Sequence, residues 1–275
     1  MNIVKIDIFW RIAYYSSEIN SYCEVYQMVL MNLNYRTNYL HTYFKTTVVI
    51  PDTNEAEYTT VWLLHGYTGD DSAWIRHVNI EQIAREHNFA IIMPEARNSF
   101  YSDSNFIPYY SYFIDEFIPK MQHLLPISKD RSKNYIVGSS MGGYGALKIA
   151  FMNDDKFSKV AALSPITDIE HFRDNPKSPM AKNTFDSIFD SPEKLAKNQL
   201  TNIYNNRQPK QEILTLCGDK DFMHEDNVMF KNFLSIHAKG RYTWMPVEGD
   251  HSWNTWSQNI NQVFDWLEKW VQKNR

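Results

Sequence analysis

Two kinds of hydrophobic pattern alternate along most of this chain. Short uninterrupted apolar runs predict strands buried on both faces, whereas apolar residues that recur every three or four positions predict helices that bury one stripe. The predicted strands cover residues 61–64, 89–93, 135–137, 160–163, 212–217 and 242–246, and the predicted helices cover 80–87, 110–124, 143–152, 227–238 and 260–271. Strands that alternate with helices in this way indicate an α/β fold, with a mostly parallel central sheet and helices on both faces.

Local features add to this prediction in the first half of the chain. Residues 39–50 are rich in Thr, Tyr and Val and predict a further strand, and the polar residues 55–60 after it predict a hairpin. The helix over 110–124 has the clearest periodicity, and Pro119 within it should produce a kink. In sheets of this class the active site lies at the carboxyl ends of the strands, so chemistry is expected in the segments that directly follow a strand.

Two regions break the alternation. Residues 165–209 contain Pro165, Pro176, Pro179 and Pro192 among many Asp, Asn and Lys residues. They predict a small cap-like insertion of short helices after Ser164, over one end of the sheet, and not a second domain. Residues 1–27 lack clean periodicity and are interpreted either as an N-terminal extension before a working start near Met28 or as an ordinary packed helix. Residues 28–275 are then expected to form a single domain.

Composition excludes several classes of protein. The net charge is −4 and no basic stripe is present, which argues against a nucleic-acid partner. No apolar run approaches the roughly 18 residues of a membrane helix, and residues 1–10 lack the pattern of a secretory signal. Cys23 and Cys217 are far apart and have no CxxC partners, which argues against a disulfide framework or a zinc site. These features together predict a cytoplasmic protein.

The sequence Gly138-x-Ser140-x-Gly142 lies between a predicted strand and a predicted helix. This is the pattern and the context of a nucleophile elbow, a tight turn that lifts a serine out of the sheet toward a base. The turn is strained, and glycine is favoured where neighbouring side chains would collide. Only 9 of the 275 residues are glycine, so roughly one serine in a thousand would have this spacing by chance. The alternative is a plain Gly/Ser turn.

A serine nucleophile needs a histidine base and an orienting carboxylate, which follow an elbow of this type in the order acid, then base. His251 comes directly after the strand over 242–246 and before the last helix, which is the expected place for the base. Asp219, Asp221 and Asp226 all follow the strand over 212–217. Asp219 suits a turn and Asp226 suits a helix N-cap, so Asp221 is the preferred acid.

The developing oxyanion needs two backbone N–H donors. The N–H of Met141 directly follows the serine, and the N–H of Tyr67 lies in the loop after the strand over 61–64, as this type of elbow requires. His65 begins that loop and is a tempting base. A histidine that ends a buried strand more often hydrogen-bonds its own loop, and that role is expected for His65.

Five motifs of this chain, in this order, resemble those of the esterase D family of α/β-hydrolases. They are His65-Gly66-Tyr67-Thr68-Gly69 with Trp74, Met93-Pro94 with Asn98-Ser99-Phe100-Tyr101, the elbow over 138–146, Gly218-Asp219-Lys220-Asp221-Phe222, and Gly249-Asp250-His251-Ser252-Trp253. The family includes S-formylglutathione hydrolases and some feruloyl or acetyl esterases, and the chain looks most like its bacterial tributyrin esterase branch. The resemblance extends from about residue 28 to the C-terminus. It implies the same triad and the same two N–H donors, and residues 1–27 have no counterpart in it.

The resemblance implies a serine carboxylesterase that hydrolyses short-chain acyl esters through an acyl-enzyme, without a metal or cofactor. The insertion is expected to shape a small pocket together with Trp74, Arg97, Asn98 and Tyr101. An S-formylglutathione hydrolase would use the same triad and is an alternative. A non-catalytic binding protein on the same scaffold is a second alternative, which the complete triad disfavours. The expected partner is a small-molecule acyl ester, and the oligomeric state stays open, a homo-oligomer included.

Overall fold

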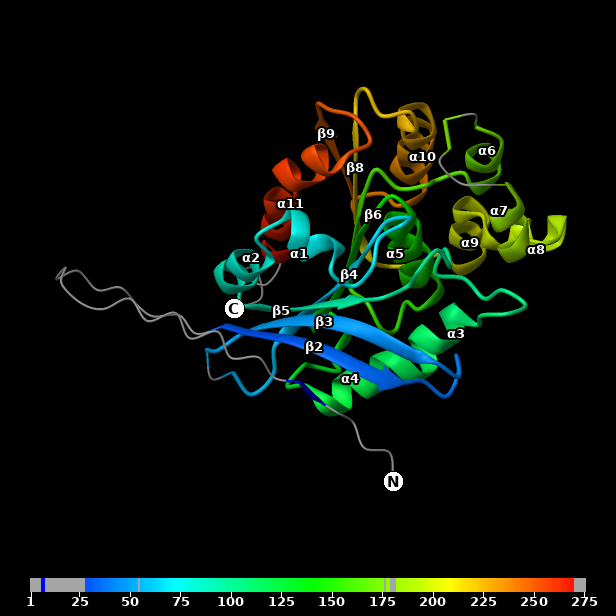
Figure 1. Cartoon of the computed structure of the whole chain (residues 1–275). Coiled ribbons are helices and arrows are strands. Elements are labelled where there is room, and N and C mark those ends of the chain that lie inside the picture. The colour runs from blue at the N-terminus through cyan, green and yellow to red at the C-terminus, as the bar shows by residue number, and fades with distance from the viewer. Residues whose placement is uncertain (1–5, 8–27, 54, 176, 179–181, 270–275) are drawn as a thin grey trace.

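The computed structural model describes residues 6–7, 28–53, 55–175, 177–178 and 182–269. Within these residues, the strands form one sheet in the order β1-β2-β3-β5-β4-β6-β7-β8-β9 (Figure 1). Their bounds are β1 (Ile6–Asp7), β2 (Met28–Arg36), β3 (Tyr43–Pro51), β4 (Thr59–Leu64), β5 (Phe89–Pro94), β6 (Asn134–Ser139), β7 (Lys159–Leu163), β8 (Glu212–Gly218) and β9 (Tyr242–Val247). The strands from β5 to β9 pair in parallel, and those from β1 to β3 add an antiparallel edge. The predicted α/β class is confirmed.

Helices cover both faces of this sheet. They are α1 (Ala73–His77), α2 (Ile80–His87), α3 (Tyr109–Tyr112), α4 (Ile118–Leu124), α5 (Met141–Met152), α6 (Ile169–Asp174), α7 (Lys182–Ile188), α8 (Pro192–Asn198), α9 (Leu200–Arg207), α10 (His224–His237) and α11 (Trp253–Glu268). Successive strand residues point to opposite faces, so Trp62 packs on the face covered by α3–α5 and α10, and Val61 packs on the face covered by α2 and α11 (Figure 1). Both side chains are completely buried.

The helix predicted over 110–124 is found in three parts. A π-helical turn, Phe113–Phe117, joins α3 to α4. Pro119 lies in the first turn of α4 and has no N–H to donate to the carbonyl four residues earlier. The wider π-helical hydrogen-bond pattern directly before Pro119 is how this helix accommodates the proline.

The start of the sheet differs from the prediction. Residues 55–60 do not form a hairpin, because β3 pairs with β5 and the polar segment carries the chain past β5 to β4. The strand predicted over 39–50 begins only at Tyr43, and β2 was not predicted. In β2, Leu33 and Tyr35 are buried while Asn32 and Asn34 are exposed, an alternation typical of a strand with one covered face.

Residues 165–209 contribute the four short helices α6–α9, which Figure 1 shows gathered beside α5 and α10. The two interpretations of residues 1–27 lie outside the described residues, except that Ile6 and Asp7 form β1 beside β2. In the part of the chain that the structure describes, no helix combines the length and the apolar character needed to cross a bilayer.

Candidate active site

Ser140 lies at a sharp turn between β6 and α5. Its φ and ψ are 53° and −119°, a conformation that costs free energy for a residue with a side chain. A Cβ at position 138 would lie 2.2 Å from the Gly142 carbonyl oxygen, and a Cβ at position 142 would lie 2.4 Å from the Leu64 carbonyl oxygen. The turn therefore requires glycine on both sides of Ser140, which is the physical reason for the elbow motif.

The structure brings the predicted base and acid to this serine. His251 Nε2 lies 2.9 Å from Ser140 Oγ, and His251 Nδ1 lies 2.9 Å from Asp221 Oδ2. An ionised carboxylate can only accept hydrogen bonds, so Nδ1 carries the imidazole proton and Nε2 is free to accept the proton of the serine hydroxyl. This is the tautomer that a general base for Ser140 requires.

Asp221 is ionised at neutral pH although it is buried. Burial by itself would raise the pKa of Asp221, but the hydrogen bond and the charge of His251 and the N–H of Met223 outweigh it and hold the pKa below its usual value. The Met223 N–H donates to Asp221 Oδ1 over 2.9 Å, so both carboxylate oxygens have a donor. The carboxylate is therefore fixed in orientation as well as in charge.

The other two carboxylates of this region have different structural roles. Asp219 is exposed and its Oδ1 accepts the N–H of Gly249 over 2.9 Å, which joins the two loops that carry the acid and the base. Asp226 does not cap α10, because the helix begins at His224, three residues before the predicted start. Its Oδ1 instead lies 2.6 Å from Nδ1 of His171 in α6. Of the three, only Asp221 has a hydrogen bond to His251.

Two aromatic rings contact the imidazole of His251. The Phe222 ring lies 4.9 Å from it at 62°, and the Trp256 ring lies 5.1 Å from it at 89°. Edge-to-face contacts of this kind restrict ring rotation and exclude water. Phe222 is adjacent to the acid in sequence, but the role of Trp256 was missed. Its only sequence signal is its place in the first turn of the helix that follows His251.

The loop over residues 65–68, here called the oxyanion loop, lies against the elbow. A Cβ at position 66 would lie 3.4 Å from Ser140 Cβ. The Gly66 carbonyl oxygen accepts hydrogen bonds from His65 Nδ1, 2.7 Å away, and from the Gly69 N–H, 3.1 Å away. In a trans peptide the N–H points opposite to the C=O, so the Tyr67 N–H is directed away from these two donors. The Met141 N–H lies at the N-terminus of α5, where a helix has no internal acceptor for it.

His65 has the role expected for it in its own loop. Its Nε2 accepts the N–H of Ala96 over 2.9 Å, so its proton lies on Nδ1 and is donated to Gly66. The side chain is 1% exposed, and burial lowers its pKa, which keeps the ring neutral. His65 thus supports the loop and has no access to a substrate.

The four residues predicted to shape the pocket have different positions. Trp74 and Tyr101 are 1% and 0% exposed, so neither ring can contact a substrate in this structure, contrary to the expectation. The Trp74 indole donates to the Leu64 carbonyl over 3.0 Å, and the Tyr101 hydroxyl donates to the His65 carbonyl over 2.9 Å. A core position buries the whole apolar surface of a large ring, and in each case a backbone carbonyl accepts the hydrogen bond of the ring's polar group.

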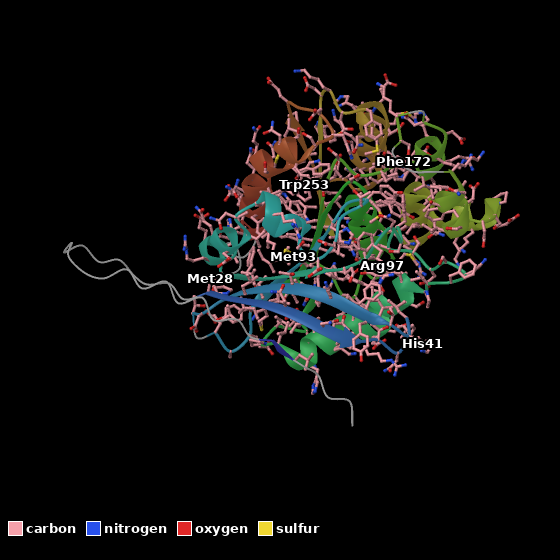
Figure 2. All side chains as sticks on the ribbon, viewed as in Figure 1. Met28, His41, Met93, Arg97, Phe172 and Trp253 are labelled. Carbon is pink, nitrogen blue, oxygen red and sulfur yellow. The ribbon has the colours of Figure 1, made fainter. Side chains whose placement is uncertain are left out.

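Arg97 and Asn98 are at least partly exposed, but their contacts are also internal. The Arg97 guanidinium lies 5.3 Å from the centre of the Phe44 ring of β3, with Nε 3.4 Å from a Glu95 carboxylate oxygen. Figure 2 shows Arg97 toward β3. Asn98 Oδ1 accepts the N–H of Thr68 over 2.8 Å, so its contact is with the oxyanion loop.

Aromatic rings of the insertion pack against the ring of Phe100. Phe172, Phe185 and Phe189 each lie about 6 Å from the ring of Phe100, at 6.1, 6.0 and 5.8 Å between centroids. All four side chains are buried, and Figure 2 shows Phe172 among the insertion helices.

Among the described residues, no three His, Cys, Asp or Glu side chains gather closely enough to hold a metal ion.

Comparisons with known proteins find esterases and serine hydrolases. A family model described as "Putative esterase" matches residues 37–267. An acetyl esterase from Caldicellulosiruptor saccharolyticus is 26% identical over 264 residues, which cover 88% of this chain and 99% of that protein. The substrate-bound fluorophosphonate-binding serine hydrolase FphF of Staphylococcus aureus has a TM-score of 0.79 and 28% identity, over 88% of this chain and 98% of that chain. The S-formylglutathione hydrolase FrmB of the same species has a TM-score of 0.77 and 27% identity, over 88% and 99%.

Proposed function

This chain belongs to the esterase family whose model it matches, and from that premise we propose that it hydrolyses short-chain acyl esters with Ser140, His251 and Asp221 as its catalytic triad. The observation that carries the proposal is the pair of 2.9 Å contacts that joins the hydroxyl of a strained elbow serine to an imidazole and the imidazole to a buried carboxylate. Nucleophile and base within hydrogen-bond reach, with the base oriented by a third group, is the arrangement that activates a serine.

In the proposed reaction, His251 Nε2 takes the proton of Ser140 as Oγ attacks the ester carbonyl carbon. Asp221 stabilises the imidazolium that forms, and the N–H groups of Tyr67 and Met141 hold the oxyanion of the tetrahedral intermediate. The imidazolium then gives its proton to the departing alcohol, which leaves an acyl-enzyme on Ser140. His251 deprotonates a water molecule that attacks this acyl group, and the acid is released as Ser140 regains its proton.

Two observations support a small acyl group. The insertion presents buried rings to Phe100, so these rings are not available to receive a long alkyl chain. The rings of Trp74 and Tyr101 are likewise buried in the core and are not available to receive an alkyl chain. The similarity to an acetyl esterase points in the same direction. We therefore expect the highest activity from acetyl to butyryl esters.

An S-formylglutathione hydrolase is the second candidate, because FrmB is 27% identical over 88% of this chain. Its chemistry would need the same three residues, so the triad does not separate the two functions. The proposed compartment is the cytoplasm for either activity. Cys217 supports this proposal, because it is buried and unpaired, as is usual in a reducing environment.

The test compares p-nitrophenyl acetate, butyrate and octanoate with S-formylglutathione on the purified protein and on Ser140→Ala. The short esters should give the highest kcat/KM, and the variant should lose several orders of magnitude in kcat. A fluorophosphonate probe should label the unmodified protein and not the variant. A preference for octanoate would refute the short-chain proposal, and a kcat/KM higher by orders of magnitude on S-formylglutathione would favour the second candidate. Absence of labelling would refute the serine mechanism itself.

A further inference from the structure

The chain segment after β5 is hydrogen-bonded to the oxyanion loop at several points. This segment, residues 96–101, is called the bracing segment here. The Ala96 N–H donates to His65 Nε2 over 2.9 Å, and Asn98 Oδ1 accepts the Thr68 N–H over 2.8 Å. The Tyr101 hydroxyl donates to the His65 carbonyl over 2.9 Å. Both ends of the oxyanion loop are therefore held by a segment that lies about 30 residues later in the sequence.

The backbone at this contact is strained. Arg97, Phe100 and Tyr101 have φ values of 47°, 53° and 49°, and Thr68 in the oxyanion loop has a φ of 64°. These are left-handed backbone conformations, which residues other than glycine adopt at a cost in free energy. They persist only where surrounding contacts impose them. Strain of this kind clusters at functional sites, so its concentration here points to a geometric requirement of the loop.

Tyr67 lies between the two held points. Before it, the His65 carbonyl is fixed by Tyr101 and the Gly66 carbonyl is fixed by His65. After it, the Thr68 N–H is fixed by Asn98. The peptide that carries the Tyr67 N–H thus has hydrogen bonds on both sides that oppose its rotation. A donor that is already oriented stabilises an oxyanion far better than one that must reorganise during the reaction.

We propose that Asn98 and Tyr101 are positioning residues that hold the Tyr67 N–H in place for the oxyanion. The inference rests on the proposed esterase function and assigns to both residues a role other than substrate contact. Neither residue touches the reacting atoms. Tyr101 is completely buried, and the Asn98 amide oxygen is already engaged by Thr68.

Three variants and one control separate positioning from other roles. Tyr101→Phe removes only the hydroxyl, and Asn98→Ala removes the acceptor for Thr68. Asn98→Asp retains an acceptor oxygen of the same reach and should recover part of the activity that Asn98→Ala loses, because its negative charge opposes the nearby oxyanion. Tyr144→Phe is the matched control, because its hydroxyl is also buried and also donates to a backbone carbonyl, that of Asn198 at 2.9 Å, away from the oxyanion loop.

The readouts are kcat and KM on p-nitrophenyl acetate, the inhibition constant of a trifluoromethyl ketone, and the melting temperature. The ketone forms a tetrahedral adduct with the serine whose oxygen occupies the oxyanion site. Complete loss of one oxyanion donor lowers kcat by about 10²–10³, so a loosened donor should lower it by about 10–100-fold. We expect this loss for Tyr101→Phe and Asn98→Ala with KM nearly unchanged, and a ketone inhibition constant that rises in proportion. Tyr144→Phe should stay within about threefold of the unmodified protein, and kcat of Asn98→Asp should lie between that of Asn98→Ala and that of the unmodified protein.

Other outcomes overturn the inference. A raised KM with unchanged kcat in Asn98→Ala would mean that this side chain contacts the substrate. A lowered melting temperature with unchanged kcat and ketone affinity in both variants would mean that the bracing segment is only structural. Failure of the proposed function is recognised separately, because the unmodified protein itself would then neither hydrolyse the ester nor react with a fluorophosphonate probe. If only the thioester is hydrolysed, the same ratios are measured on that substrate.

Discussion

The ammonium nitrogen of Lys148 lies 2.6 Å from the hydroxyl oxygen of Ser102, and both side chains are at least 98% buried. Lys148 belongs to α5, the helix that begins at the nucleophile elbow. The rings of Tyr110 and Tyr144 lie 5.5 and 5.8 Å from its nitrogen. Burial lowers the pKa of Lys148 from 10.5 to about 7, so the charged and neutral forms of its amine are both populated near neutral pH. The elbow helix therefore carries a buried group whose charge depends on pH.

This arrangement predicts that the contribution of Lys148 to the free energy of unfolding grows as the pH rises above 7. Between pH 7 and 10.5 the unfolded chain binds a proton at Lys148 that the folded chain has released, so this group makes the free energy of unfolding increase with pH in that window. Lys148→Met should weaken this dependence by the contribution of Lys148, while Lys159, whose pKa burial lowers to about 8, keeps its own smaller contribution. Ser102 still donates to the Phe100 carbonyl over 2.8 Å, so the variant keeps a partner for the hydroxyl. Urea unfolding at pH 7 and pH 9 measures the effect, and parallel pH profiles for the two proteins would contradict it.

The choice of Asp221 as the acid predicts a sharp contrast between neighbouring aspartates. Asp221→Asn should lower kcat by about 10⁴, because an amide beside Nδ1 favours the wrong tautomer of His251. Asp219→Asn should change kcat only a few-fold, since an amide oxygen can still accept the Gly249 N–H. Steady-state kinetics on p-nitrophenyl acetate checks both. Equal losses in the two variants would mean that the acid loop acts as a structural unit and that Asp221 has no special role.

The parts of the candidate site that could be predicted from sequence are those whose residue type is set by the neighbouring residues of the chain. The elbow requires glycine at positions 138 and 142 because of backbone contacts within the turn and with the end of β4. His251 was predicted as the base because it lies in the short loop between β9 and α11. In each case the residue type and its place beside a strand carry the information, and no knowledge of distant packing is needed.

The parts that could not be predicted depend on burial by distant segments. Trp74 lies in α1 and Tyr101 lies in a loop, both in segments that follow strands. Whether such a ring lines a pocket or fills the core depends on neighbours such as Trp253 and Tyr109. Strand order has the same non-local character. The predicted hairpin after β3 failed because β5, which comes later in the sequence, inserts between β3 and β4. Local patterns predict that a strand exists, but its pairing partners are set by the whole sheet.

The contact between His171 and Asp226 predicts a second pH dependence, opposite in sign to that of Lys148. The hydrogen bond that His171 donates to Asp226 raises the pKa of His171, so the contribution of this contact to stability is present at low pH and is lost as the pH rises through the raised value. The His171 side chain is 57% exposed, so the effect should be at most about 1 kcal/mol. The comparison is the melting temperature of His171→Gln and of the unmodified protein at pH 6 and pH 8.5. A stability difference that does not shrink toward pH 8.5 would contradict the prediction.

Gly218, at the end of β8, predicts a coupled loss of stability and activity. A Cβ there would lie 2.2 Å from the Gly249 carbonyl oxygen, which also accepts the Lys220 N–H over 2.9 Å. Relief of this clash must separate the loop of Asp221 from the loop of His251, so Gly218→Ala should lose kcat and about 1–3 kcal/mol of stability. Gly240→Ala is the control, because its surroundings are open and its φ of 76° should lower stability by about 1–2 kcal/mol without changing kcat. Kinetics and urea unfolding of both variants decide, and normal kcat in Gly218→Ala would show that the two loops adjust without moving the triad.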